Sequence, residues 1–182
     1  MPTTAPYGSW KSPITTDLIV SGSIGLGEVA LDGEDIYWVE MRPAEGGRMV
    51  VVKRTPDGEI SDITPGPFSA RTRVHEYGGG AYLVHEGTVY FSNYSDQRMY
   101  RQDSGEAPEP ITPETDMRYA DGCFDAARNR VICVREDHTQ DGEPINAIVA
   151  VDALGKAEQV VLSQGSDFCS TPRISPDGST LA

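Results

Sequence analysis

The sequence has few of the features that mark membrane, nucleic-acid-binding or disulfide-linked proteins. It lacks any apolar run approaching the roughly 18 residues that a membrane helix needs, so we expect no membrane partner. Lysine and arginine total 15 against 28 aspartates and glutamates, for a net charge of −13. Without a basic face the chain is not expected to bind nucleic acid. The acidic surface favours solubility, or alternatively attraction of a cationic ligand such as a peptide amino terminus.

Cysteine is scarce and its pattern excludes a disulfide framework. The three residues Cys123, Cys133 and Cys169 are odd in number and form no Cys-x-x-Cys pair. Cys123 and Cys133 lie in apolar runs, where a free thiol behaves as a small hydrophobic group. The N-terminus has neither a basic start nor an apolar segment typical of a secretory signal. A cytoplasmic location is therefore expected.

Motifs for catalysis and metal binding are absent as well. No Gly-x-Ser-x-Gly elbow occurs, so no serine is predicted to be a nucleophile and no catalytic residue is assigned. His75-Glu76 begins a zinc-protease pattern, but Gly79 stands where the second histidine is required. The calcium-loop pattern is missing, and the glycine-rich segment 22–27 matches neither a dinucleotide nor a Walker loop. We expect no metal and no cofactor.

Short apolar or alternating runs, bounded by Gly, Pro, Asp and Asn, fill most of the chain and predict β-strands. They fall into groups of four. The expected strands are 25–31, 35–41, 49–54 and 59–63, then 80–85, 88–93, 98–102 and 109–111, then 119–125, 130–136, 146–151 and 158–162, with a further strand at 171–175.

The groups repeat with a period near fifty residues. Ile63-Thr64-Pro65, Ile111-Thr112-Pro113 and Leu162-Ser163 occupy equivalent places, 48 and 51 residues apart. Four short strands per repeat of this length are typical of propeller blades. We therefore predict an all-β fold, a partial β-propeller of about three and a half blades; a β-sandwich or open barrel is the alternative. The expected blades are 22–65, 72–113, 117–163 and a truncated 167–182, after a lead-in at 1–21.

The last nine residues read as a strand, a turn and the start of a second strand. Ser175-Pro176-Asp177-Gly178 has turn chemistry, because proline presets φ and glycine tolerates positive φ. A strand opened there would leave an unpaired edge. We expect the chain to be part of a larger protein.

The densest polar cluster lies between the first two repeats, over residues 71–80. Its candidate functional side chains are Arg71, Arg73, His75, Glu76 and Tyr77. Three consecutive glycines, 78–80, allow close approach of the backbone to another group. These residues are predicted to face a ligand or an adjoining domain; the alternative is that they only connect neighbouring blades, with arginine and glutamate paired and His75 hydrogen-bonded.

These motifs resemble the amino-terminal propeller of the prolyl oligopeptidase family, specifically its dipeptidyl aminopeptidase and acylaminoacyl peptidase-like members with a TolB-type propeller. The resemblance spans nearly the whole chain. It rests on the segments Val74-His75-Glu76-Tyr77-Gly78-Gly79-Gly80-Ala81, Val89-Tyr90-Phe91-Ser92-Asn93, Gln97-Arg98-Met99-Tyr100 and Ile174-Ser175-Pro176-Asp177-Gly178. The first segment is the most specific, because Ser-Pro-Asp-Gly occurs in many propellers.

The resemblance implies a serine peptidase in which the propeller covers an α/β-hydrolase domain and admits short peptides. The expected partners are a peptide substrate and that C-terminal hydrolase domain. The present sequence contains no hydrolase domain, so it should be inactive by itself and no triad residue is transferred to it. Dipeptidyl members hold the substrate amine with propeller carboxylates, and the resemblance makes Glu76 the first candidate for this role.

Two other interpretations remain open. The chain could belong to a non-catalytic TolB-like propeller that acts as a protein-binding platform, because open propellers bind partners through their loops. It could also be an unstable truncation without a function of its own, since an unclosed ring exposes two blade faces.

Overall fold

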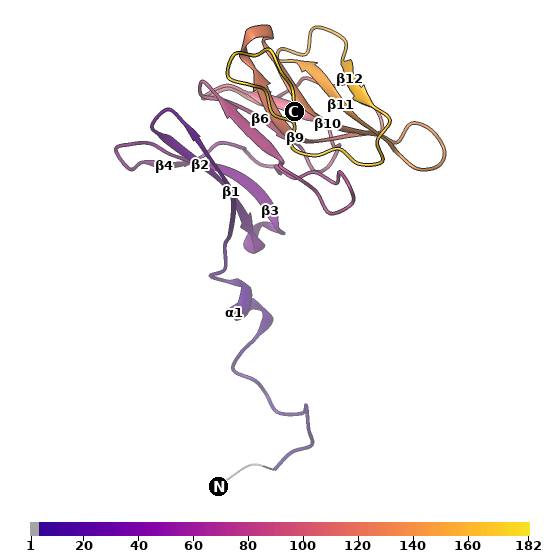
Figure 1. Cartoon of the computed structure of the whole chain (residues 1–182). Coiled ribbons are helices and arrows are strands. Elements are labelled where there is room, and N and C mark those ends of the chain that lie inside the picture. Colours follow the sequence, from indigo (N-terminus) through magenta and orange to yellow (C-terminus); the bar gives the residue numbers. More distant parts are fainter. Residues whose placement is uncertain (1–3) are drawn as a thin grey trace.

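The computed structural model describes residues 4–182 and consists mainly of three four-stranded antiparallel sheets (Figure 1). Within each sheet the strands follow chain order, as in a meander. The predicted all-β partial propeller is confirmed. Whether the expected residue ranges are domains of a larger protein stays a prediction.

The strand bounds are close to those expected from the sequence. The first sheet holds β1 (Gly25–Asp32), β2 (Asp35–Arg42), β3 (Arg48–Arg54) and β4 (Ile60–Asp62). The second holds β5 (Tyr82–His85), β6 (Thr88–Ser92), β7 (Met99–Gln102) and β8 (Glu109–Pro110). The third holds β9 (Met117–Asp125), β10 (Arg130–Asp137), β11 (Ile145–Asp152) and β12 (Val160–Gln164).

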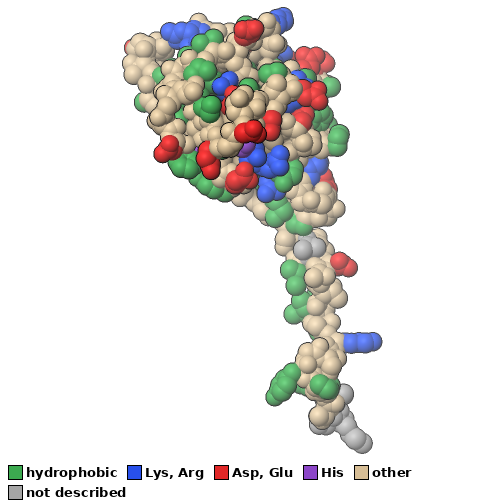
Figure 2. All heavy atoms as spheres, turned by 90° about the vertical axis from the view of Figure 1, so that its right-hand side faces the viewer, with side chains coloured by type: hydrophobic (Ala, Val, Ile, Leu, Met, Phe, Trp, Pro, Cys, Tyr) green, Lys and Arg blue, Asp and Glu red, His purple; other side chains and the backbone are tan. Residues whose placement is uncertain are grey.

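The described part of the chain, residues 4–182, also holds three short helices: α1 (Thr16–Val20), η1 (Pro43–Glu45) and η2 (Ala126–Arg128). The α1 helix lies on the N-terminal segment, which extends away from the sheets as a stalk (Figures 1 and 2). Helical periodicity did not predict α1, because a helix of five residues shows no repeat. Its start does carry a local signal, since the Thr15 hydroxyl accepts from the Leu18 N–H at 3.1 Å.

The core lies between neighbouring sheets, which explains why a single sheet would not be stable alone. Tyr37 and Val51 of the first sheet pack with Phe91 of the second. Between the second and third sheets, Tyr90 and Val149 belong to one buried cluster. The fully buried valines and aromatic residues therefore join sheets to one another rather than strands within one sheet.

Strand β5 contacts both β1 and β9, the first strands of the other two sheets, and acidic side chains at two strand irregularities make part of these contacts. Glu28 of β1 has φ 52° and its carboxylate accepts from the Ala81 N–H at 2.8 Å. Asp121 of β9 has φ 55° and accepts from the Gly80 N–H at 2.6 Å. The carboxylates thus satisfy backbone donors at the entry to β5, where no strand partner is available.

Residues 165–182 run beside the third sheet and contain one isolated bridge, Ile174↔Leu181, where a strand was expected at 171–175. The turn at Ser175–Gly178 forms, with the Gly178 N–H donating to the Ser175 carbonyl at 2.8 Å. A hairpin without a third strand pairs weakly, which accounts for the short ladder. Its assignment to a fourth blade stays a prediction.

Within residues 4–182 we find no helix with the length and apolar character needed to cross a membrane.

Candidate functional site

The polar segment 71–80 forms the loop that leads from the first sheet into β5. Its chain direction reverses at two consecutive left-handed residues, His75 (φ 56°) and Glu76 (φ 64°). Val74 anchors the turn, since its side chain is fully buried against Ala120 and Val134 of the third sheet. Non-glycine residues at positive φ each cost about 1 kcal/mol or more, so surrounding contacts must hold this backbone in place.

The main contact that holds it is Glu136, from β10. The Glu136 side chain is only 4% exposed, and its Oε1 accepts from the His75 N–H at 2.7 Å. The His75 ring Nδ1 lies 3.1 Å from the same oxygen, without the alignment of a hydrogen bond. A carboxylate from the third sheet therefore fixes the loop of the second.

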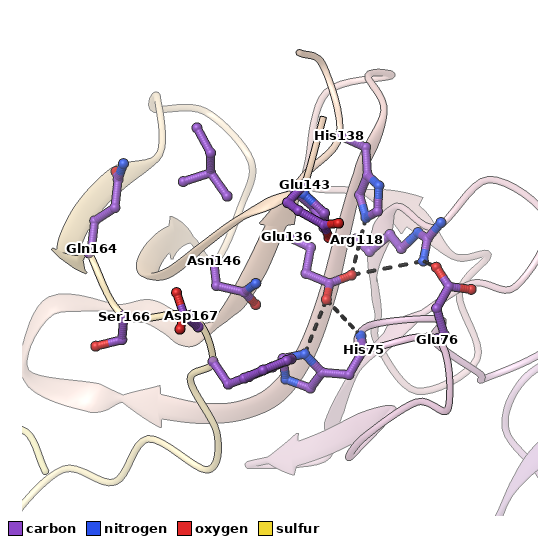
Figure 3. A pocket seen from close by; sticks show the side chains of 14 residues that line it. His75, Glu76, Arg118, Glu136, His138, Glu143, Asn146, Gln164, Ser166 and Asp167 are labelled. Atoms are coloured by element: carbon purple, nitrogen blue, oxygen red, sulfur yellow. Dashed lines mark hydrogen bonds and ion pairs between the residues drawn. The ribbon is translucent and has the colours of Figure 1, made fainter. Parts of the chain in front are cut away.

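Two further side chains of the third sheet approach Glu136. The His138 Nε2 lies 3.1 Å from Glu136 Oε2, and the Arg118 guanidinium lies 3.9 Å from it. Figure 3 shows His75, Arg118 and His138 converging on this carboxylate. The buried carboxylate thus has polar groups of three residues around it, one of them the Arg118 cation, and a buried carboxylate requires such partners.

Glu76 is the exposed member of the cluster, with a side chain 79% accessible. Arg118 Nη1 donates to Glu76 Oε1 at 2.6 Å and to the Arg73 carbonyl at 2.8 Å. The hydrogen bond from Arg118 lowers the pKa of Glu76, so its carboxylate stays ionised well below neutral pH. One carboxylate oxygen remains open to solvent.

The cluster forms one side of a pocket of about 790 Å³. Glu143, from the loop between β10 and β11, lies on the same side, near Glu136 (Figure 3). The other side comes from the start of β11, the end of β12 and the segment after β12, with Asn146, Gln164, Ser166 and Asp167. The pocket is completed by Pro144, Ile145, Gly165 and Phe168. Four carboxylates and one guanidinium line it, so the pocket favours a cationic ligand.

The His75 ring is held on both sides. Its side chain is 7% exposed, and Nε2 donates to the Cys169 carbonyl at 3.1 Å, because a carbonyl can only accept. The Phe168 ring meets it edge-on with centroids 5.3 Å apart. Tyr77, with its ring 5.8 Å from His75, is 85% exposed. The His75 ring is therefore fixed by its neighbours, whereas the Tyr77 side chain is exposed; the roles of both residues stay predictions.

Arg71 and Arg73 point to a different part of the molecule. The Arg71 guanidinium lies 4.7 Å and that of Arg73 6.0 Å from the centre of the Tyr94 ring, in the loop between β6 and β7. The Arg73 N–H donates to the Gln97 side chain at 2.7 Å. The five predicted residues therefore divide: His75 and Glu76 line the pocket, Tyr77 lies beside His75, and the arginines pack on the second sheet.

Sequence reasoning missed Arg118, Glu136 and His138. Arg118 lies 42 positions from Glu76 and Glu136 lies 61 positions from His75, and both are on strands whose sequence predicts ordinary core. His138 follows β10 directly and contacts Glu136, two positions earlier. One signal in the sequence could have pointed to Glu136. It is a charged residue close to the apolar run 131–134, in a strand that is mostly buried. Among residues 4–182, no group of three or more His, Cys, Asp or Glu side chains is arranged so that it could hold a metal ion.

The three stacked meanders, with an acidic pocket at the edge of the third, define a propeller-type protein. Similar solved structures indicate which kind of propeller protein this is. The chain is 38% identical to a puromycin-hydrolyzing peptidase of Mycobacterium tuberculosis, with a TM-score of 0.84 over 99% of this chain and 30% of that one. It is 34% identical to puromycin hydrolase, with a TM-score of 0.85 over 97% of this chain and 30% of that one. A mutant of that hydrolase complexed with PGG matches equally well.

The predicted resemblance to the prolyl oligopeptidase family is confirmed, since these peptidases belong to it. The chain spans 30% of the length of the solved peptidases it matches. No family model matches the chain, and no curated protein matches it.

Proposed function

We propose that this chain is the propeller portion of a serine peptidase that positions or gates short peptides for an α/β-hydrolase domain. The observation that carries the proposal is identity of 34–38% to two peptidases over almost the whole chain. The partners in this proposal are a peptide substrate and the hydrolase domain. The chemistry of bond cleavage would belong to that domain, because no catalytic residue is assigned here.

The pocket beside Glu76 supports binding of the peptide amino terminus. A desolvated ammonium group needs charged acceptors, and Glu76, Glu143 and Asp167 all line the pocket. Glu143 and Asp167 form no ion pair within residues 4–182, and Arg118 occupies one oxygen of Glu76. Phe168, Ile145 and Pro144 offer apolar surface for the first side chains of the peptide.

The test is the affinity of the chain for tri-alanine and for N-acetylated tri-alanine, measured by isothermal titration at low salt. Acetylation removes the positive charge, and we expect it to weaken binding about tenfold or more. Glu76→Gln should weaken binding of the free peptide by a similar factor and leave the acetylated peptide unaffected.

Glu109→Gln is the matched control, since Glu109 is an exposed glutamate on β8, away from the pocket, and the change alters net charge equally. Equal affinity for the two peptides, or equal weakening by Glu76→Gln and Glu109→Gln, would contradict amine recognition at Glu76.

The cytoplasmic location belongs to this proposal. It is supported by the cysteines, all three of which are free thiols. Burial raises the pKa of the Cys133 and Cys123 thiols, so both favour the neutral, less reactive form.

A further inference from the structure

A second pocket lies between the second and third sheets, on different residues from the acidic one. Its volume is about 610 Å³. The linker from β8 to β9 forms one wall and the loop between β11 and β12 the other. The lining residues used below are Arg98, Ile111, Met117, Arg135, Lys156 and Glu158.

The charge of this pocket is opposite to that of the whole protein. Arg98, Arg135 and Lys156 line it, and Glu158 is the one acidic residue among its described lining. In a chain with 15 basic and 28 acidic residues, three cations around one cavity form a local site for an anion.

Arg135 lacks a close acceptor, although its side chain is only 12% exposed. Its Nη1 lies 3.4 Å from Gln159 Oε1 and its Nη2 lies 3.7 Å from Asp137 Oδ2, while the buried Nε has no partner. Arg101 and Arg118 also have a buried Nε without a partner, but each has a carboxylate oxygen at 2.6 Å. Arg135 is therefore the least satisfied of these three guanidinium groups.

The pocket walls are held by packing between the two sheets. Gly155 has φ 66°, and a Cβ on it would lie 2.8 Å from Ile111 Cα, so only glycine lets the loop lie this close. The Gln159 side chain donates to the Tyr119 hydroxyl at 2.6 Å. The Arg98 guanidinium donates twice to the Thr112 carbonyl, at 2.9 and 2.6 Å. The cations therefore face a preformed cavity.

We propose that this pocket binds a small organic carboxylate with an apolar chain. The carboxylate would accept from the open Arg135 donors near Lys156, since a guanidinium fork matches two carboxylate oxygens. The chain of the ligand would lie against Ile111, Met117 and the neighbouring prolines Pro110 and Pro113. This site is separate from the acidic pocket, so failure of either proposal leaves the other standing.

The experiment uses the whole 182-residue chain, titrated with hexanoate, hexanol and inorganic phosphate and followed by amide chemical shifts in NMR spectra. Hexanoate should shift the amides of residues 111, 112, 114–117 and 155–159, and it should bind at least tenfold more tightly than hexanol or phosphate. Hexanol measures binding through the apolar wall of the pocket alone, and phosphate measures binding through its positive charges alone.

Arg135→Gln should weaken hexanoate binding about tenfold, because it removes the charge-assisted donors. Lys156→Gln should weaken hexanoate binding by a smaller factor. Because Lys156 lies on an exposed loop, this variant should stay folded and keeps the test valid even if Arg135→Gln unfolds the chain. Arg101→Gln is the matched control, outside the pocket, and should change affinity less than twofold. The proposal is overturned if hexanol or phosphate binds as tightly as hexanoate, or if neither Arg135→Gln nor Lys156→Gln weakens hexanoate binding more than Arg101→Gln does.

Discussion

The two halves of the loop at 71–77 contact different sheets and use different kinds of interaction. The first half, with Arg71 and Arg73, lies over the exposed face of Tyr94 in the second sheet. The second half, with His75 and Glu76, reaches Glu136 and Arg118 of the third. The two halves are similar in polarity and adjacent in sequence, but their contacts should contribute unequally to the stability of the fold. Losing a charged contact costs more free energy when the contact is buried.

The largest effect is expected from Glu136→Ala. The change leaves the His75 N–H, His138 and Arg118 without their shared carboxylate, and we expect the free energy of unfolding to fall by about 3 kcal/mol. Urea denaturation measures this loss. Glu143→Ala is the control, because Glu143 lines the same pocket as an exposed residue and should alter stability little. Equal midpoints for the two variants would show that Glu136 does not hold the loop.

A smaller, pH-dependent effect is expected at Glu28 of β1, whose carboxylate accepts from the Ala81 N–H just after this loop. Desolvation of its carboxylate raises the pKa of Glu28, so the folded state holds this proton more tightly than the unfolded chain. Its contribution to stability is therefore present below the unfolded pKa and is lost as pH rises through the folded one. Melting temperatures of wild type and Glu28→Gln should be compared in ~1-unit steps from about pH 4 to about pH 7, a range that begins near the ordinary pKa of glutamate.

The wild type should lose stability relative to Glu28→Gln as pH rises over that range, because glutamine does not ionise. If the difference in melting temperature between the two proteins stayed constant over this pH range, Glu28 would have the same pKa in the folded and unfolded states.

The smallest effect is expected from Arg71→Ala. The contact of its guanidinium with Tyr94 is exposed, and such cation–π contacts contribute about 0.5 kcal/mol. Tyr94→Leu should lower the free energy of unfolding by a similar amount. Because both changes remove the same contact, the double variant should be no less stable than either single variant, except for any packing that leucine loses. A double-mutant cycle by urea denaturation gives the coupling. A coupling above about 2 kcal/mol would remove the contrast between the two halves of the loop.

Much of the fold could be predicted because its rules are local. Turn residues such as Asp32-Gly33 and alternating strands recur with a period near fifty, and three of the expected groups of four strands form. The α1 helix and the weak pairing at 174–181 were not foreseen. Both depend on few residues, for which a single cap or one strand neighbour decides the outcome.

The candidate site was predicted in part. The segment 71–80 was singled out by its charge and glycines, but its partners Arg118 and Glu136 lie on another sheet. Which half of the segment faces the pocket depended on the left-handed turn at His75 and Glu76, and neither residue type requires positive φ.

The sequence by itself determined the strands, the repeat and the resemblance to peptidase propellers, because these follow from side-chain periodicity, turn chemistry and a specific run of residues. Tertiary structure alone decided which charges meet. Stacking of the second and third sheets brings Glu136 to His75 and leaves Arg135 without a close acceptor, since only packed sheets set distances between residues far apart in the chain.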